Sequence, residues 1–308
     1  MTTSNVSTVT STSDHIVSSH DSARLRQSTK NRKRGRALVF HLCSLALIVI
    51  VLYPAVWMLM SSFKPSSEIV GNVSLIPADF TTANFQKAIE GIGGVSFWTF
   101  FMNSTILAVG SVIGITLSCS ISAYAFARID FPGRNIFFAL MIGTLLLPFH
   151  VVIIPQYIVF NRLGLVDTFV PLLIGKFLAA EAFFVFLMVQ FMRNLPRELD
   201  EAARIDGAGH VRIFRSIMLP LMKPALVTSA IFAFIWSWND FFGPLLYLKK
   251  PDLYSLPIAL RLFVDQTTTS DYGAQMAMAV LALVPVMLFF LVFQRYLVEG
   301  VATQGLKG

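Results

Sequence analysis

Three charged side chains lie inside long apolar runs of the sequence, where an ionised group is costly unless it meets a polar partner or a cavity. They are Lys176, Glu181 and Asp240. Lys176 and Glu181 stand five positions apart, about 140° around a continuous helix, so they make poor partners within one helix. Two interpretations stay open for these groups. They pair with other helices or with a second subunit, or they line the path of a polar solute.

A second set of chemically capable residues recurs at helical spacing. Trp236, Asn239, Asp240 and Gly243 stand at i, i+3, i+4 and i+7, which places them on one face of a continuous helix. An aromatic plane beside a carboxylate and an amide can stack on a sugar ring and hydrogen-bond its hydroxyls. A purely structural role, in which the tryptophan packs and the polar pair bonds to a neighbouring helix, is equally open.

The elements that must position these residues are apolar helices. Of the 308 residues 55% are hydrophobic and 13% charged, whereas a soluble domain carries roughly 25% charged residues. This composition predicts an all-α, polytopic membrane protein. An enzyme has little support, because the sequence has no nucleophile elbow and no paired His motif on a helix. Six segments are long enough to cross a bilayer as helices: 37–60, 100–127, 136–160, 169–192, 225–248 and 273–298.

The distribution of Lys and Arg predicts the orientation. Residues 1–36 are rich in Ser and Thr and end in a basic cluster, which indicates a disordered cytoplasmic tail. With this tail in the cytoplasm, 17 of the 24 Lys and Arg residues fall on that side and six on the other, with Lys176 inside a span. The positive-inside rule then places both termini in the cytoplasm. The net charge of +7 is explained by this asymmetry, so we expect membrane lipid and no nucleic acid as a partner.

The same pattern divides the chain into four parts. After the tail, residues 37–97 form the first transmembrane helix and an external loop, and residues 98–294 form a core of five transmembrane helices. A cytoplasmic loop at 194–223 interrupts this core, and residues 295–308 form a cytoplasmic C-terminal tail.

Several small residues and prolines indicate packing and not chemistry. Cys43 and Cys119 lie in apolar runs without metal-ligand spacing to any His, so we expect neither a disulfide nor a metal site. Small residues four apart in the second span allow close helix contact: Gly110, Gly114, Ser118 and Ser122. Pro148 and Pro155 predict a bend in the third span.

The cytoplasmic loop carries the most specific motif. Pro196, followed by acidic residues and later by Gly207, predicts a short helix with a favourable dipole and a left-handed end. A second short helix is expected to stop before Pro220. From these residues alone the loop could rest on lipid headgroups, or it could dock a partner through Ala202 and Ala203.

The spacing of this motif matches a known family. Glu201-Ala202-Ala203, then Gly207, Ile217 and Leu219-Pro220 resemble the EAA loop of ABC importer permeases. The adjoining segment 203–208 is similar to the carbohydrate-importing branch, which includes the maltose-type inner-membrane subunit. Further matches are Leu163-Gly164-Leu165, Trp238-Asn239-Asp240-Phe241, Gln294-Arg295-Tyr296 and the terminal Lys307-Gly308.

The resemblance implies a type I ABC importer permease architecture with six transmembrane helices, in a bacterial cell membrane. It implies two ATP-binding subunits, a second homologous permease subunit and an extracytoplasmic solute-binding protein, with a sugar or oligosaccharide as substrate. ATP and Mg²⁺ would be bound by the partners, because this chain has no G-x-x-x-x-G-K-[ST] phosphate loop, no cofactor site and no catalytic residues. The residues expected to contact an ATPase subunit are Glu201, Ala202, Ala203, Asp206, Gly207, Leu219 and Pro220.

The solute path in this interpretation is expected to include Lys176, Glu181, Trp236, Asn239 and Asp240. Two alternatives remain. One is an ABC permease for a non-sugar solute such as glycerol phosphate, because Lys176 could attract an anion. The other is a proton-coupled secondary transporter, which would need inverted repeats and an intramembrane carboxylate–His chain. Uptake that persists in vanadate would favour this second alternative.

Overall fold

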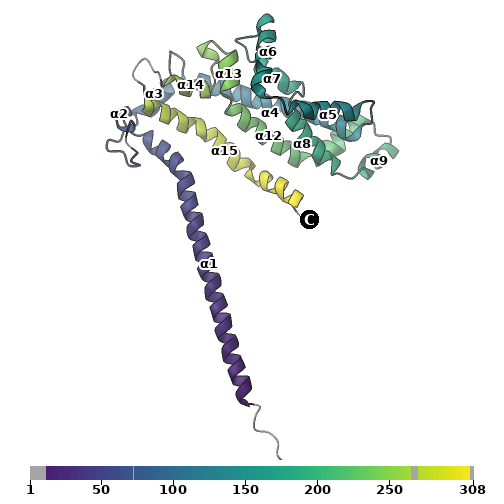
Figure 1. The fold of residues 1–308 in the computed structure, drawn as a ribbon. Coiled ribbons are helices and arrows are strands. Elements are labelled where there is room, and N and C mark those ends of the chain that lie inside the picture. The colour runs from purple at the N-terminus through teal and green to yellow at the C-terminus, as the bar shows by residue number, and fades with distance from the viewer. Residues whose placement is uncertain (1–11, 72, 265–269, 306–308) are drawn as a thin grey trace, which may run out of the picture. The chain divides into compact units, whose positions relative to one another are not determined.

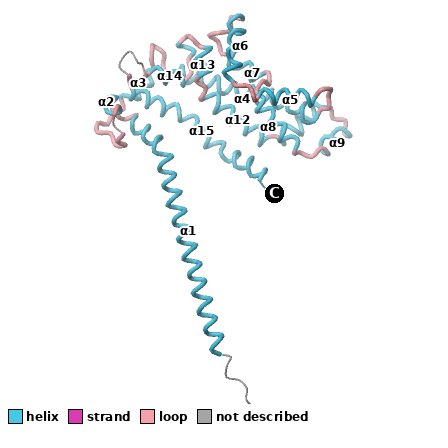
Figure 2. Tube along the Cα trace, viewed as in Figure 1, coloured by secondary structure: helices cyan, strands magenta, loops and turns pink. Residues whose placement is uncertain are grey.

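A computed structural model describes residues 12–71, 73–264 and 270–305. These residues form helices and loops (Figure 2). The exception is one antiparallel bridge between Ile92 and Val95. The chain falls into two units, Met1–Met58 and Leu59–Gly308. The predicted all-α fold is confirmed.

The helices follow one another along the chain as labelled in Figure 1. They are α1 (Thr12–Ser61), α2 (Ser66–Ile69), α3 (Ala83–Glu90), α4 (Phe97–Arg128), α5 (Arg134–Thr144), α6 (Phe149–Arg162), α7 (Val170–Phe177), α8 (Ala182–Arg193), α9 (Glu198–Ile205), α10 (His210–Ile213), the π-helix η1 (Phe214–Met218), α11 (Leu219–Leu221), α12 (Lys223–Trp238), α13 (Phe242–Tyr247), the 3₁₀ turn η2 (Pro251–Leu253), α14 (Leu256–Leu262) and α15 (Tyr272–Gly305).

Among the described residues, four segments are long and apolar enough to cross a membrane: Ala37–Ser61, Phe97–Arg128, Val170–Arg193 and Tyr272–Gln294. Two further candidates are bent pairs. Arg134–Thr144 and Phe149–Arg162 meet at 99°, and His210–Leu221 and Lys223–Trp238 meet at 74°. The molecule is therefore an all-helical membrane protein with four to six candidate spans.

Both ends of the chain are more helical than the sequence predicted. α1 begins at Thr12, whereas we expected disorder throughout residues 1–36; residues 1–11 lie outside the described part. The stretch from Thr12 to Arg36 contains no proline, so the helix of the first span can propagate into it without a new nucleation step. α15 likewise continues to Gly305, into the segment predicted as a C-terminal tail.

Pro148 bends the third candidate span. α5 ends at Thr144, and α6 begins directly after Pro148, which has an extended backbone (φ −60°, ψ 128°). A proline lacks the N–H that a continuous helix needs and disfavours helical geometry in the residue before it. The predicted bend is confirmed at Pro148, whereas Pro155 lies inside α6 without breaking it.

The central helix of the second unit is α4, which contacts α7, α8 and α12. Its C-terminal half packs in one hydrophobic cluster with α8, α9 and η1, where Cys119 is fully buried as a small apolar side chain. Its N-terminal half packs in a second cluster with α3, α12, α14 and α15. Cys43, in the first unit, is exposed on α1.

Small residues on α4 let α7 approach closely, as predicted. A Cβ atom added to Gly110 would lie 3.0 Å from Leu173 Cδ2. A Cβ added to Gly114 would lie 2.9 Å from Phe177 Cδ2 and 3.1 Å from the backbone carbon of Lys176. One turn further on, the Ser118 hydroxyl donates a hydrogen bond to the Lys176 carbonyl (2.6 Å).

The segment predicted as an external loop contains the short helices α2 and α3, which both contact α15. Asp271, just before α15, joins the three. Its carboxylate accepts hydrogen bonds from Ser66 Oγ (2.6 Å) on α2 and from Lys87 Nζ (2.7 Å) on α3. Oδ1 of Asp271 also accepts the N–H of Ala274 in the first turn of α15 (3.0 Å).

Candidate functional site

The loop after α8 forms the short helix predicted from its acidic residues and glycine. α9 starts at Glu198 directly after Pro196 and Arg197, with Glu198, Asp200 and Glu201 in its first turn. Acidic groups there interact favourably with the positive end of the helix dipole. Gly207 follows the helix in the left-handed region (φ +77°), where a residue with a Cβ is strained.

α9 is tied to the end of α4 by a buried ion pair. Nη1 of Arg128 lies 3.1 Å from Oδ2 of Asp200, and the two side chains are 2% and 8% exposed. Nη2 of Arg128 also donates to the carbonyls of Met192 (2.7 Å) and Leu195 (2.9 Å) at the end of α8. One guanidinium therefore holds the ends of α4 and α8 and the helix α9 in a fixed relation.

The sequence does not reveal this ion pair. It indicates only a positive charge at the end of a span, Arg128, and an acidic residue that favours the helix dipole, Asp200. The available signal was a lone arginine at the end of one span and an acid in the loop after another. No sequence spacing connects the two.

The predicted partner-contacting residues divide into exposed and buried positions. Glu201, Ala202, Asp206, Gly207 and Pro220 are exposed, and Leu219 is half-buried. Ala203 instead packs in the core cluster formed with α4 and α8. Only one alanine of the motif therefore faces outward.

Two apolar side chains outside the EAA-type motif are exposed on the same loop. Ile205 is 87% exposed and Val211 is 80% exposed. An apolar surface on a polar loop is typical of an interaction site.

The second half of the loop differs from the prediction. We expected a helix that stops before Pro220, but α10, η1 and α11 continue through this proline to Leu221. The N–H of Leu219 bonds to the Phe214 carbonyl, a π-type bond that widens the turn just before the proline. In this half of the loop Ile213 and Met218 are buried, whereas Val211 is exposed.

Lys176 and Glu181 pair with each other, contrary to the geometry predicted for a continuous helix. The fourth span is broken between α7 and α8, where Ala179 adopts a left-handed backbone (φ +54°). The break brings Lys176 Nζ into direct contact with the Glu181 carboxylate. Ser118 of α4 supports the break, since its Oγ accepts the N–H of Ala179 (3.2 Å).

The fifth span is broken as well, so Trp236, Asn239, Asp240 and Gly243 do not share one helical face. α12 ends at Trp238, and Oδ1 of Asp240 accepts the N–H of Gly243 (3.1 Å) in the first turn of α13. A Cβ on Gly243 would lie 2.6 Å from Oδ2 of Asp240, so this cap needs a glycine. Asn239 is exposed and donates to the Ile235 carbonyl of its own helix (2.8 Å).

The two breaks nevertheless gather the predicted solute-path residues in one region. Trp236 is 48% exposed, and its ring lies 5.1 Å from Phe183 and 5.2 Å from Phe184 in the first turn of α8. Lys176 attracts the Asp240 carboxylate electrostatically. We call Lys176, Glu181, Trp236, Asn239 and Asp240 the polar cluster. In the described residues no group of three or more His, Cys, Asp or Glu could hold a metal ion.

A helical membrane protein with a loop helix fixed to its spans and a polar cluster inside them fits a transport subunit. Residues 110–303 match the family described as "Binding-protein-dependent transport system inner membrane component".

Three relatives cover most of this chain. The chain is 36% identical over 262 residues to the arabinooligosaccharides transport system permease protein AraQ of Halalkalibacterium halodurans, covering 84% of this chain and 92% of the relative. It is 33% identical over 283 residues to the diacetylchitobiose uptake system permease protein NgcG of Streptomyces coelicolor, covering 92% of each. It is 35% identical over 269 residues to the sn-glycerol-3-phosphate transport system permease protein UgpE of Brucella abortus, covering 85% and 95%.

The fold also matches a solved structure. A chain from a bacterial ABC transporter involved in the import of the acidic polysaccharide alginate superposes with a TM-score of 0.74 at 24% identity. The match covers 85% of this chain and 96% of that one.

The chain belongs to the family of binding-protein-dependent ABC importer permeases, as its EAA-type loop predicted. It is a multi-pass inner-membrane protein. Members of this family carry no catalytic site, so the protein is a transport subunit and not an enzyme. Family membership also argues against the alternative of a proton-coupled secondary transporter.

Proposed function

We propose that this permease imports a sugar or oligosaccharide into the cytoplasm by alternating access, driven by ATP hydrolysis in partner subunits. The assembly would contain two ATP-binding subunits that hold ATP and Mg²⁺, a second homologous permease subunit and an extracytoplasmic solute-binding protein. Both termini and α9 would face the cytoplasm, in line with the excess of Lys and Arg on that side. The names of two relatives, AraQ and NgcG, support an oligosaccharide as the substrate class.

The observation that carries this proposal is the fixed position of α9. A loop helix can pass on a displacement only if it moves together with the spans. Arg128 provides that connection, because it binds Asp200 of α9, the Met192 carbonyl in the last turn of α8 and the Leu195 carbonyl just after α8. The exposed side of the loop, with Glu201, Ala202 and Ile205, stays free for an ATP-binding subunit.

α4 offers a route from this tie to the polar cluster. Arg128 and Ser118 stand ten residues apart on α4, about 15 Å along the helix axis. Ser118 bonds to the last turn of α7 and to Ala179 within the α7–α8 break, across which Lys176 and Glu181 meet. A rotation of α4 caused at its cytoplasmic end would therefore alter the break and the access to the polar cluster.

The charge of the polar cluster supports a neutral sugar over glycerol phosphate, which the name of UgpE brings into consideration. An anionic solute needs a cation without a partner. Lys176 is neutralised by Glu181 and further attracted by Asp240, so the cluster offers no net positive charge. Two members of the cluster, Trp236 and Asn239, are exposed and could stack on a sugar ring and bond to its hydroxyls.

Cross-linking tests the docking of α9. In a variant without native cysteines, Ala202→Cys should cross-link to an ATP-hydrolysing subunit in native membranes. Leu163→Cys, which is also exposed but lies in the turn between α6 and α7, is the matched control and should not. Capture of the ATPase by the control alone would contradict the proposed orientation.

Uptake tests the substrate class. Proteoliposomes with the full assembly should accumulate labelled arabino- or chito-oligosaccharides with ATP, and vanadate should abolish this uptake. Asp240→Asn should reduce uptake while the subunits still assemble. Uptake of glycerol phosphate with no oligosaccharide uptake would refute the sugar proposal and leave the permease family unaffected.

A further inference from the structure

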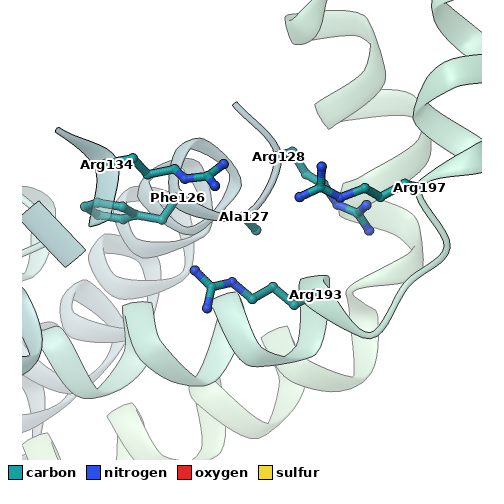
Figure 3. A pocket seen from close by; sticks show the side chains of 6 residues that line it. All are labelled: Phe126, Ala127, Arg128, Arg134, Arg193 and Arg197. Carbon is teal, nitrogen blue, oxygen red and sulfur yellow. The ribbon is translucent and has the colours of Figure 1, made fainter. Parts of the chain in front are cut away.

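Four arginines surround one pocket. It lies at the same end of the spans as α9. The pocket has a volume of about 400 Å³ and is lined by Phe126, Ala127, Arg128, Arg134, Arg193 and Arg197. Figure 3 shows the four arginine side chains arranged around this opening. They come from the end of α4, the start of α5, the end of α8 and the turn before α9.

Two of the four positive charges lack a carboxylate. Arg128 pairs with Asp200 (3.1 Å), and Arg134 pairs with Asp130 (2.5 Å). Within the described part of the chain neither Arg193 nor Arg197 forms an ion pair. The guanidinium of Arg193 instead lies 4.8 Å from the centre of the Phe138 ring. The pocket therefore presents about two uncompensated positive charges.

Arg128 adds a donor that the fold leaves without an acceptor. Its Nε is buried and has no hydrogen-bond partner, although both terminal nitrogens are bonded. An unpaired buried donor costs free energy, and so does Oδ1 of Asp200, which the same ion pair leaves without a donor. Several guanidinium groups around one small volume suit the tetrahedral oxygens of a phosphate, because each offers a planar fork of N–H donors.

The position of the pocket along the spans points to a lipid as the source of that phosphate. Arg128 and Arg193 are the last residues of two candidate spans, and Arg134 is the first residue of a third. These positions lie where a membrane's headgroups begin. Beside Arg134, α5 exposes Ile136 (67%), Phe137 (56%) and Leu140 (63%), an apolar surface on which acyl chains can lie.

We propose that this pocket binds the phosphodiester headgroup of an anionic phospholipid from the leaflet on the α9 side. Arg193 and Arg197 supply the uncompensated charge, and Arg128 and Arg134 complete the cradle. Since Arg128 also holds Asp200, the lipid would sit against the tie that fixes α9. Under the proposed orientation this leaflet is the cytoplasmic one. Lipid binding itself does not depend on orientation, so the two proposals can fail separately.

The test is lipid retention by the full chain, purified with its partners in mild detergent and examined by native mass spectrometry. With phosphatidylglycerol or cardiolipin added, we expect a bound anionic lipid that phosphatidylcholine does not replace. The double variant Arg193→Gln/Arg197→Gln should lower this affinity roughly 25-fold, because each cation near a membrane surface contributes about a factor of five. A matched control, Arg212→Gln/Arg215→Gln, removes the same charge from exposed positions of the same loop outside the pocket.

Three outcomes would overturn the proposal. Equal loss in both double variants would mean unspecific adsorption of the loop to headgroups. Displacement of the lipid by millimolar inorganic phosphate would assign the pocket to a soluble phosphate. Release of an ATP-hydrolysing partner by the pocket variant, with unchanged lipid retention, would assign the arginines to a protein interface.

Discussion

At the scale of single residues, Arg128 decides where the loop helix lies. Its side chain replaces water around three groups at once, the Asp200 carboxylate and two carbonyls at the end of α8. A buried charge of this kind is stable only while its partners stay in place. The position of α9 thus depends on side-chain chemistry and not on the loop backbone alone.

Replacing Arg128 should destabilise the protein more than replacing Asp200. Loss of one member of a buried ion pair costs about 3–5 kcal/mol. Asp200→Asn leaves Arg128 with its two carbonyl acceptors, so we expect a value at the lower end. Arg128→Met leaves a buried carboxylate and two unpaired carbonyls, so its effect should be larger. Denaturant unfolding in detergent measures both.

Arg215→Met serves as the control for this pair, because Arg215 is exposed on η1. Its stability should stay within about 0.5 kcal/mol of the parent. Equal stability of the Asp200→Asn and Arg215→Met variants would show that the Arg128–Asp200 ion pair contributes nothing to the free energy of unfolding.

At the scale of elements, the contact between α4 and α7 depends on the absence of a side chain at Gly114. Gly114→Ala should cost about 1–3 kcal/mol through overpacking, because the new Cβ would meet the Lys176 backbone, which cannot rotate away. Gly143→Ala on α5 meets nothing within 4 Å and should be neutral or stabilising by up to about 1 kcal/mol. Thermal unfolding of the two variants compares them, and a similar melting temperature for both would exclude close packing as the reason.

The junction of α2, α3 and α15 should weaken at low pH. Burial alone raises the pKa of Asp271, but the hydrogen bonds from Lys87, Ser66 and Ala274 together outweigh it, so the pKa lies below its usual value. A carboxyl with a lowered folded-state pKa stabilises the fold above its unfolded pKa of about 3.9 and loses this effect as the pH falls through the folded value. Lys87 is 56% exposed, so the ion pair is worth only about 0.2–1 kcal/mol.

Asp271→Asn should accordingly lower the melting temperature at pH 7, and by less as the pH falls below about 3.9. Asp252 is the control, because its side chain is exposed and forms no described ion pair. Asp252→Asn should leave the melting temperature unchanged across this pH range. If Asp271→Asn lowers the melting temperature equally across this pH range, the ionised Asp271 carboxylate is not the source of the stabilisation.

The sequence predicts these elements only as far as local patterns reach. Apolar runs located the spans, and Pro148 located one bend, because a proline breaks a helix by its own chemistry. The break at Ala179 was missed because a distant group, Ser118, stabilises it. At Asp240 the carboxylate itself caps the first turn of α13 through the N–H of Gly243, a role that the helical spacing of these residues does not indicate. Likewise, the motif identified Ala202 and Ala203 without telling which of them faces the core.

At the scale of the whole molecule, coupling should be sensitive to the shape of the loop beyond α9. Gly207 has a positive φ and open space around it, so Gly207→Ala introduces backbone strain of about 1 kcal/mol without a clash. Gly209→Ala is matched, since Gly209 also has open space but an ordinary φ of −75°. We expect Gly207→Ala to reduce ATP-driven uptake relative to ATP hydrolysis in the reconstituted assembly. If the Gly209→Ala variant loses as much coupling, the loop's shape is not the cause.

The tie between α4 and α9 has a consequence for biogenesis. Arg128 leaves the ribosome long before the residues that satisfy it, so during translation its guanidinium must remain hydrated at the bilayer surface. α9 can therefore adopt its final place only after α8 has inserted and supplied its terminal carbonyls. Nascent chains arrested before Asp200 should leave Arg128 open to an arginine-modifying reagent, and full-length chains should protect it.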